Sequence, residues 1–109
     1  MNLRHSKVMD PQVLSEWVLR WKTEGKSLVL CHGHFNVIHP GHLRFLTYAK
    51  AQGDVVIVSV MSPEELVPEN RPHFFDQEER AAGVANLEIV DAVVMSLGSP
   101  LSLIEIVGP

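Results

Sequence analysis

Two histidines three positions apart, His39 and His42, follow an apolar run and a glycine turn. The apolar run predicts a strand at Ser27–Cys31, and the segment that begins at Pro40 has the apolar spacing of a helix. If Pro40 occupies the first turn of that helix, both imidazoles lie on one face at its N-terminus. The free N–H groups and the positive end of the helix dipole would hold an anionic group there. Such a site can stabilise the charge on a transferring phosphoryl group by positioning alone.

Two glycines accompany the histidine pair. Gly33 and Gly41 would let the backbone approach an anion closely, because neither carries a side chain. A structural alternative is that His39 and His42 are solvated or helix-capping side chains. Their place directly between a strand and a helix favours the phosphate site over that alternative.

A zinc site is a second alternative, because His32 and His34 alternate onto one strand face beside Cys31. No second cysteine pair and no cluster of carboxylates supports it, so we predict no metal ligands on the protein. A single cysteine cannot form an internal disulfide. The position of Cys31 in the apolar run therefore indicates a buried thiol in a reducing compartment.

The segment Gly33-His34-Phe35-Asn36, followed by His39-Pro40-Gly41-His42, resembles the G-x-F-D and H-x-G-H signatures of the cytidylyltransferase-like nucleotidyltransferases. Among these enzymes, the chain most resembles the adenylyltransferases that activate heptose 1-phosphate for lipopolysaccharide synthesis. The resemblance covers nearly the whole chain, from Lys7-Val8-Met9 to Val90-Asp91. The H-x-G-H motif in its strand–loop–helix setting is specific for the superfamily and says little about the substrate.

The resemblance implies transfer of NMP from ATP or CTP to a phosphorylated sugar or alcohol, with release of pyrophosphate. Mg²⁺ would accompany the nucleotide. His39 and His42 match the catalytic histidines that stabilise the α-phosphate in the transition state. The nucleotide-binding residues that the resemblance implies are Gly33, His34, Phe35, Asn36, Gly41, Arg71 and Arg80, the two arginines being expected to contact phosphates. Members of the family are often dimers, so a homodimer is expected.

The chain departs from the family pattern at three places along the sequence. Asn36 stands where an aspartate is usual, Met61-Ser62-Pro63 replaces Asn-Ser-Asp, and Val67 lies where a lysine is common. An alternative function is therefore a catalytically impaired nucleotide-binding module, or a structural module of a larger or bifunctional enzyme.

The composition is that of an ordinary globular protein. The 109 residues are 46% hydrophobic and 20% charged, which fits a single domain. The net charge of −4 argues against a large nucleic-acid interface. No segment approaches the ~20 apolar residues of a membrane span, and the N-terminus lacks the apolar core of a signal peptide. We expect a cytoplasmic protein that binds neither nucleic acid nor membrane.

The order of elements predicts an α/β fold, a Rossmann-like doubly wound parallel sheet of the H-x-G-H nucleotidyltransferase type, incomplete with three strands. We expect three strands: Ser27–Cys31, buried on both faces, Val55–Val60 and Asp91–Met95. We expect four helices: from Pro11 to Gly25, over Pro40–Gln52, from the cap Asp76 to Asn86, and over Leu101–Val107. A loop or short helix is expected at Ser62–Pro72. Trp17 and Trp21 should pack the first helix onto the sheet, and Leu43 should face inward. Residues 1–109 would form one nucleotidyltransferase-like domain, truncated at its C-terminus. Because an open sheet edge is a liability, further strands are expected from residues beyond Pro109 or from a partner chain.

Overall fold

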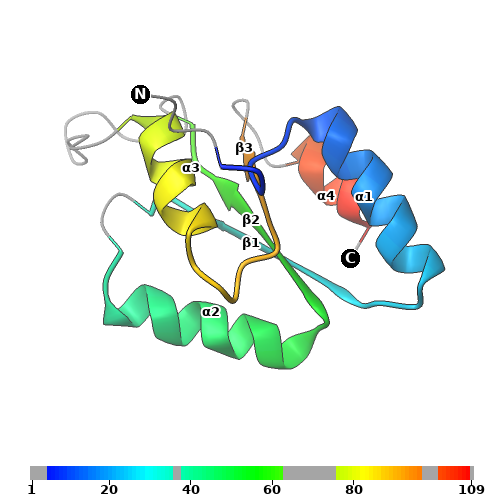
Figure 1. Ribbon diagram of the computed structural model, residues 1–109, viewed down its shortest axis with the longest axis horizontal. Helices are drawn as coiled ribbons and strands as arrows, with labels where there is room; N and C mark the ends of the chain where they lie inside the picture. The colour runs from blue at the N-terminus through cyan, green and yellow to red at the C-terminus, as the bar shows by residue number, and fades with distance from the viewer. Residues whose placement is uncertain (1–4, 36–37, 63–75, 97–100, 109) are drawn as a thin grey trace.

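Helices cover both faces of a central three-stranded sheet in the computed structural model, which describes residues 5–35, 38–62, 76–96 and 101–108 (Figure 1). The elements, in chain order, are α1 (Pro11–Thr23), β1 (Leu28–Gly33), α2 (Pro40–Gln52), β2 (Val55–Val60), α3 (Gln77–Ala85), β3 (Ala92–Met95) and α4 (Leu101–Val107). The strands are parallel and lie in the order β1-β2-β3. This confirms the predicted Rossmann-like α/β class.

Two of the helices begin at carboxylate caps, as the sequence predicts. The Asp10 side chain accepts the N–H of Val13 at 2.9 Å, and Pro11 occupies the first turn of α1. The Asp76 side chain accepts the N–H of Glu79 at 2.8 Å, and the Glu79 carboxylate accepts the N–H of Asp76 at 3.1 Å. This reciprocal capping box fixes the first turn of α3.

The sheet has one fully buried strand and two outer strands. All six residues of β2 are buried, because the strand is paired on both sides and covered on both faces. In β1, only Cys31 is buried and the other five residues are half-buried. Both faces of β1 are covered, since Val29 packs against one apolar cluster and Leu28 and Leu30 pack against the other. The strand is less buried than predicted, because it pairs with β2 alone among the described residues. At the opposite edge, Val8 forms a bridge to Val93 of β3.

Two apolar clusters fill the space between the sheet and its helices. Leu46 and Ala49 of α2 and Ala81 and Val84 of α3 pack on one face, together with Val58 of β2. The opposite face is covered by α1 and α4, through a second set of buried side chains: Leu14, Val18, Trp21, Leu103 and Val107, packed with Ile57 and Val94. Figure 1 shows α2 and α3 on one side of the sheet and α1 and α4 on the other.

Two large side chains are more exposed to solvent than predicted. Trp17 is 38% exposed, with its ring 5.6 Å from that of Trp21 and the Arg20 guanidinium 4.8 Å above it. Trp21 alone of the pair is buried against the sheet. Leu43 is 42% exposed, so the inward face of α2 is narrower than the spacing predicted. The loop or short helix predicted at residues 62–72 lies outside the described residues, except for Ser62.

Polar contacts hold the C-terminal end of α2 against the sheet. Lys50 Nζ donates to the Asp54 carbonyl at 2.7 Å and to Asp91 Oδ2 at 3.1 Å. The same Asp91 oxygen accepts the N–H of Val56 at 2.8 Å. These bonds connect the last turn of α2 to the residues just before β2 and β3. None of the helices within the described ranges is long and apolar enough to span a lipid bilayer.

Candidate functional site

The candidate site lies where β1 ends and α2 begins, at the carboxyl ends of the parallel strands. The last residue of β1 is Gly33, whose carbonyl accepts the N–H of Met61 at 2.7 Å, just after the end of β2. His34 and Phe35 follow, and the chain re-enters the described region at Ile38 before α2 starts at Pro40. Ligands of open α/β sheets bind at this edge.

His39 and His42 together cap the N-terminus of α2. His39 is the N-cap residue, and its Nδ1 accepts the N–H of Gly41 at 3.0 Å. His42 Nδ1 accepts the N–H of His39 at 3.2 Å, which closes a reciprocal capping box. The two ring centroids are 4.0 Å apart, so the imidazoles lie side by side at the helix mouth. The structure thus places the two predicted residues together.

These capping bonds assign the ring protons. In a neutral imidazole one nitrogen donates and the other accepts. Because Nδ1 accepts a main-chain N–H in both rings, the proton of each neutral ring lies on Nε2. Each ring can therefore donate an Nε2–H, and His39 is exposed to solvent. Two such donors beside the positive end of a helix dipole suit an anion.

The residue after His34 has a strained backbone. Phe35 has a φ of 54°, in the left-handed region that non-glycine residues rarely adopt. Conformations of this kind cost about 1–3 kcal/mol and persist only where surrounding contacts impose them. The Phe35 side chain is only 4% exposed, and its ring centroid lies 5.2 Å from that of His42. The turn thus brings a buried aromatic ring against one of the two imidazoles.

Gly33 and Gly41 are close to these rings, which explains why neither position has a side chain. A Cβ on Gly33 would lie 2.8 Å from Cε2 of Phe35. A Cβ on Gly41 would lie 2.7 Å from Cε1 of His39 and 3.0 Å from its Nδ1. The sequence predicted close approach of the backbone to an anion at both glycines. The structure shows close approach of aromatic and imidazole rings.

Arg80, which the resemblance predicts to contact phosphate, is buried and donates to the main chain of the loop. Its side chain is 2% exposed, and Nη1 donates to the His34 and Met61 carbonyls, both at 2.9 Å. Burial lowers the pKa of this guanidinium, and the nearby Asp76 carboxylate partly opposes that effect. Arg80 therefore supports the loop from inside the protein. The predicted site residues Asn36 and Arg71 lie outside the described residues.

Gln77 is a residue near the site that the sequence analysis did not select. Its Nε2 donates to the Val60 carbonyl at 3.0 Å and to the Ser96 carbonyl at 2.8 Å. The signal in the sequence is its spacing, because Gln77 and Arg80 are three positions apart and share one face of α3.

His32, one of the two histidines considered for a zinc site, lies against the neighbouring strand. His32 Nδ1 is 2.9 Å from the hydroxyl of Ser59, its cross-strand neighbour. Within the described parts of the chain, no three His, Cys, Asp or Glu side chains are grouped so as to hold a metal ion. Cys31 is buried, and burial raises the pKa of its thiol.

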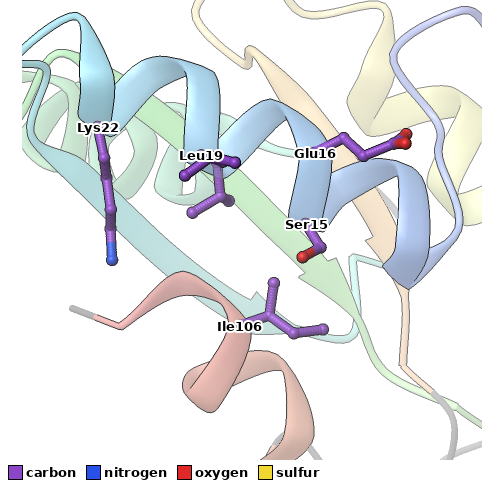
Figure 2. Close-up of a pocket in the computed structure, with 6 residues that line it drawn as sticks. Ser15, Glu16, Leu19, Lys22 and Ile106 are labelled. Carbon is purple, nitrogen blue, oxygen red and sulfur yellow. The ribbon is translucent and has the colours of Figure 1, made fainter.

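A groove lies on the other face of the molecule, between α1 and α4 (Figure 2). Its lining combines apolar side chains, among them Leu19 and Ile106, with Ser15, Glu16 and Lys22. Because α1 and α4 cover the face of the sheet opposite α2, this groove is separate from the histidine pair.

Comparison with known proteins gives one family and a consistent set of relatives. The family model described as "Cytidylyltransferase-like" matches residues 30–98, which include most of β1, the histidine pair, α3 and β3. The chain is 34% identical over 108 residues to the "Bifunctional protein HldE" of Citrifermentans bemidjiense, and 35% identical over 108 residues to that of Geobacter sulfurreducens. Each alignment covers 95% of this chain and 22% of the relative, so the chain spans about a fifth of the length of these curated relatives.

A solved structure is similar as well. The crystal structure of the lipopolysaccharide core biosynthesis protein from Thermoplasma volcanium superimposes with a TM-score of 0.72 at 27% sequence identity. The match covers 78% of this chain and 70% of that one. The structural similarity and the match to the family model are therefore consistent with each other.

Proposed function

Because the chain belongs to the cytidylyltransferase-like family, we propose that it acts as a nucleotidyltransferase: it moves NMP from ATP or CTP to a phosphorylated sugar or alcohol and releases pyrophosphate. Heptose 1-phosphate is the acceptor we favour, on the sequence resemblance. The observation that carries this proposal is the pair of imidazoles at the N-terminus of α2, with Nδ1 of each occupied by a main-chain N–H.

The reaction is a displacement at the α-phosphate. An oxygen of the acceptor phosphate forms a bond to the α-phosphorus, and the bond from that phosphorus to the oxygen of the leaving pyrophosphate breaks. Negative charge spreads over the oxygens of the transferring group. His39 and His42 would donate Nε2–H to these oxygens, and the helix dipole would add to the stabilisation. The chain needs no covalent intermediate for this step.

Mg²⁺ would enter the site with the triphosphate and neutralise part of its charge when bound. Such an ion is held largely by the phosphates and by water, so it needs no group of three protein ligands. The described residues, which contain no such group, are compatible with an ion carried by the nucleotide. Asn36 in place of the usual aspartate leaves one carboxylate fewer beside it.

A second candidate is nucleotide binding without transfer. It is favoured by Met61, which stands where the family has a polar residue: the side chain is half-buried, while its main-chain N–H and carbonyl are bound to Gly33 and Arg80. The backbone contacts that shape the loop are thus present, although a polar side chain is not. This candidate predicts nucleotide affinity without pyrophosphate release.

Calorimetry with ATP and with CTP, each with Mg²⁺, tests binding and identifies the base. Pyrophosphate release with heptose 1-phosphate or glycerol 3-phosphate as acceptor tests transfer. The informative variants keep the helix cap and remove the ring. His39→Asn retains a favoured N-cap residue, and His42→Gln retains the usual partner in a capping box.

Both variants should fold with nearly the stability of the wild type and release pyrophosphate at least ten times more slowly. Asp10→Asn, which exchanges one good N-cap for another on α1, is the matched control and should leave turnover unchanged. Unchanged turnover in both histidine variants would refute the assigned role. Binding of a nucleotide with no pyrophosphate release from the wild type would favour the second candidate. Light scattering would check the expected homodimer.

A further inference from the structure

We propose that Arg80 and Gln77 are positioning residues, which hold the turn at Phe35 so that its ring supports His42. The inference rests on the proposed function, because it assigns these residues a role in that same site. They would act through the main chain, from inside the protein, without touching the nucleotide.

Together the two side chains join the carboxyl ends of all three strands to α3. Arg80 Nη1 donates to the carbonyl of His34, just after β1, and to that of Met61, just after β2. Gln77 Nε2 donates to the carbonyl of Val60, the last residue of β2, and to that of Ser96, just after β3. At this edge the strand-to-strand hydrogen bonds end, so carbonyl groups need other donors. Four carbonyls from three separate segments thus accept hydrogen bonds from two side chains of one helix face, and the Val60 carbonyl also accepts the N–H of Ser96 at 2.9 Å.

The bond from Arg80 to His34 has a particular consequence for the loop. Because a peptide unit is planar and trans, its C=O and N–H point in opposite directions. Fixing the His34 carbonyl on Arg80 therefore also fixes the direction of the Phe35 N–H. Phe35 is the residue with a φ of 54°, a conformation that requires support from its surroundings. The Arg80 bond supplies part of that support at the preceding peptide.

The Phe35 ring carries the effect to the histidine pair. The ring is buried above Gly33, and its centroid lies 5.2 Å from that of His42. The His42 ring lies in turn 4.0 Å from that of His39. A path of direct contacts therefore runs from Arg80 through the His34–Phe35 peptide and the Phe35 ring to both imidazoles.

The same geometry separates this role from a phosphate contact. The Arg80 side chain is 2% exposed, and its Nη1 donates to two main-chain oxygens. A buried cation that fixes carbonyl dipoles adds rigidity to the turn. Lysine is a poor substitute, since an ammonium group lacks the planar fork of a guanidinium.

The test compares Arg80→Lys and Gln77→Leu with Val84→Ala. Val84 lies on the same helix, is fully buried and makes only apolar contacts with the core cluster, so Val84→Ala lowers stability without touching the carbonyls. Unfolding in urea identifies the conditions at which the three variants are equally folded. We expect Arg80→Lys to lower kcat at least tenfold with less than a threefold change in KM for the nucleotide. Gln77→Leu should show a smaller loss in kcat, and Val84→Ala none.

Hydrogen exchange at the Phe35 amide provides a readout that does not depend on activity. It should be at least ten times faster in Arg80→Lys than in Val84→Ala. Equal exchange in these two variants, or equal kcat, would overturn the proposal. If the wild type itself releases no pyrophosphate, the proposed function fails, and the exchange comparison alone decides whether Arg80 positions the turn.

Discussion

Gly41→Ala tests whether the imidazole of His39 has to lie against the backbone of α2. The Cβ of an alanine would lie 2.7 Å from Cε1 of His39. The ring has to retreat by about 0.8 Å to reach a normal carbon–carbon contact of about 3.5 Å. This movement weakens the bond from the Gly41 N–H to His39 Nδ1, which is 3.0 Å long in the wild type. The substitution thus displaces a side chain that we assign to catalysis.

The expected effect on stability is small, because two changes oppose each other. Alanine is favoured over glycine in a helix by about 0.5–1 kcal/mol. Weakening a good N-cap interaction costs about 1 kcal/mol. The expected effect on turnover is large, since a displacement of about 1 Å at a catalytic group can cost about 100-fold. We expect Gly41→Ala to lower pyrophosphate release by a factor between about 10 and 100.

Gly83→Ala is the matched control for this experiment. Gly83 is exposed on α3, and a Cβ there would meet nothing within 4 Å. This variant should keep wild-type turnover and raise the Tm by roughly 4 °C. Thermal unfolding and the pyrophosphate assay measure both variants. If Gly41→Ala gains stability as Gly83→Ala does and keeps wild-type turnover, the close approach of His39 is not needed and the reasoning is refuted.

Three further predictions concern stability and reactivity. Asp10→Ala should lower the free energy of unfolding by about 1 kcal/mol, and the Tm by about 4–8 °C, because its carboxylate caps α1 through the Val13 N–H; an unchanged Tm would contradict this. Burial raises the pKa of the Cys31 thiol, so a thiol reagent at pH 8 should react rapidly only after unfolding in urea, and rapid reaction of the native protein would contradict its burial. The N–H and O–H of Ser27 lower the pKa of the Asp54 carboxyl in the folded state. The stability that this carboxylate provides is therefore present above its unfolded pKa and is lost as the pH falls through the folded pKa. In a plot of the free energy of unfolding against pH, Asp54→Asn should therefore show a smaller loss of stability on the acid side than the wild type.

The elements of the fold could be predicted where local chemistry decides them. Asp10 and Asp76 are carboxylates directly before apolar helical patterns, and both cap the helices expected of them. β2 has five β-branched residues out of six and is fully buried. The first four residues of β1, Leu28–Cys31, are also apolar, but β1 lies at one side of the sheet, so five of its six residues are only half-buried. The position of a strand within a sheet depends on its neighbouring strands, so it cannot be inferred from the strand's own sequence.

The sequence was enough to locate the candidate site, but not to assign a role to each of its residues. The order of strand, glycine loop and Pro40 was enough to bring His39 and His42 together at a helix N-terminus. Arg80 was predicted to contact phosphate, because a sequence shows a cation without showing what covers it. The packing of α3 against the strand ends turns that side chain inward. Phe35 was predicted to bind the nucleotide, and nothing in the local pattern indicated its left-handed conformation or the bond from the distant Arg80 to the peptide before it.

The two interpretations of the histidine pair, helix caps or phosphate ligands, are compatible because an imidazole has two nitrogens. Capping uses Nδ1 in both rings and thereby assigns the proton to Nε2. The bond that stabilises the start of α2 is thus the same bond that prepares the ring to donate. Asparagine and glutamine can provide the cap through the amide oxygen, but they lack the imidazole ring and its Nε2–H. For this reason His39→Asn and His42→Gln remove one role while keeping the other, whereas alanine at either position would remove both and leave the cause of a lost activity ambiguous.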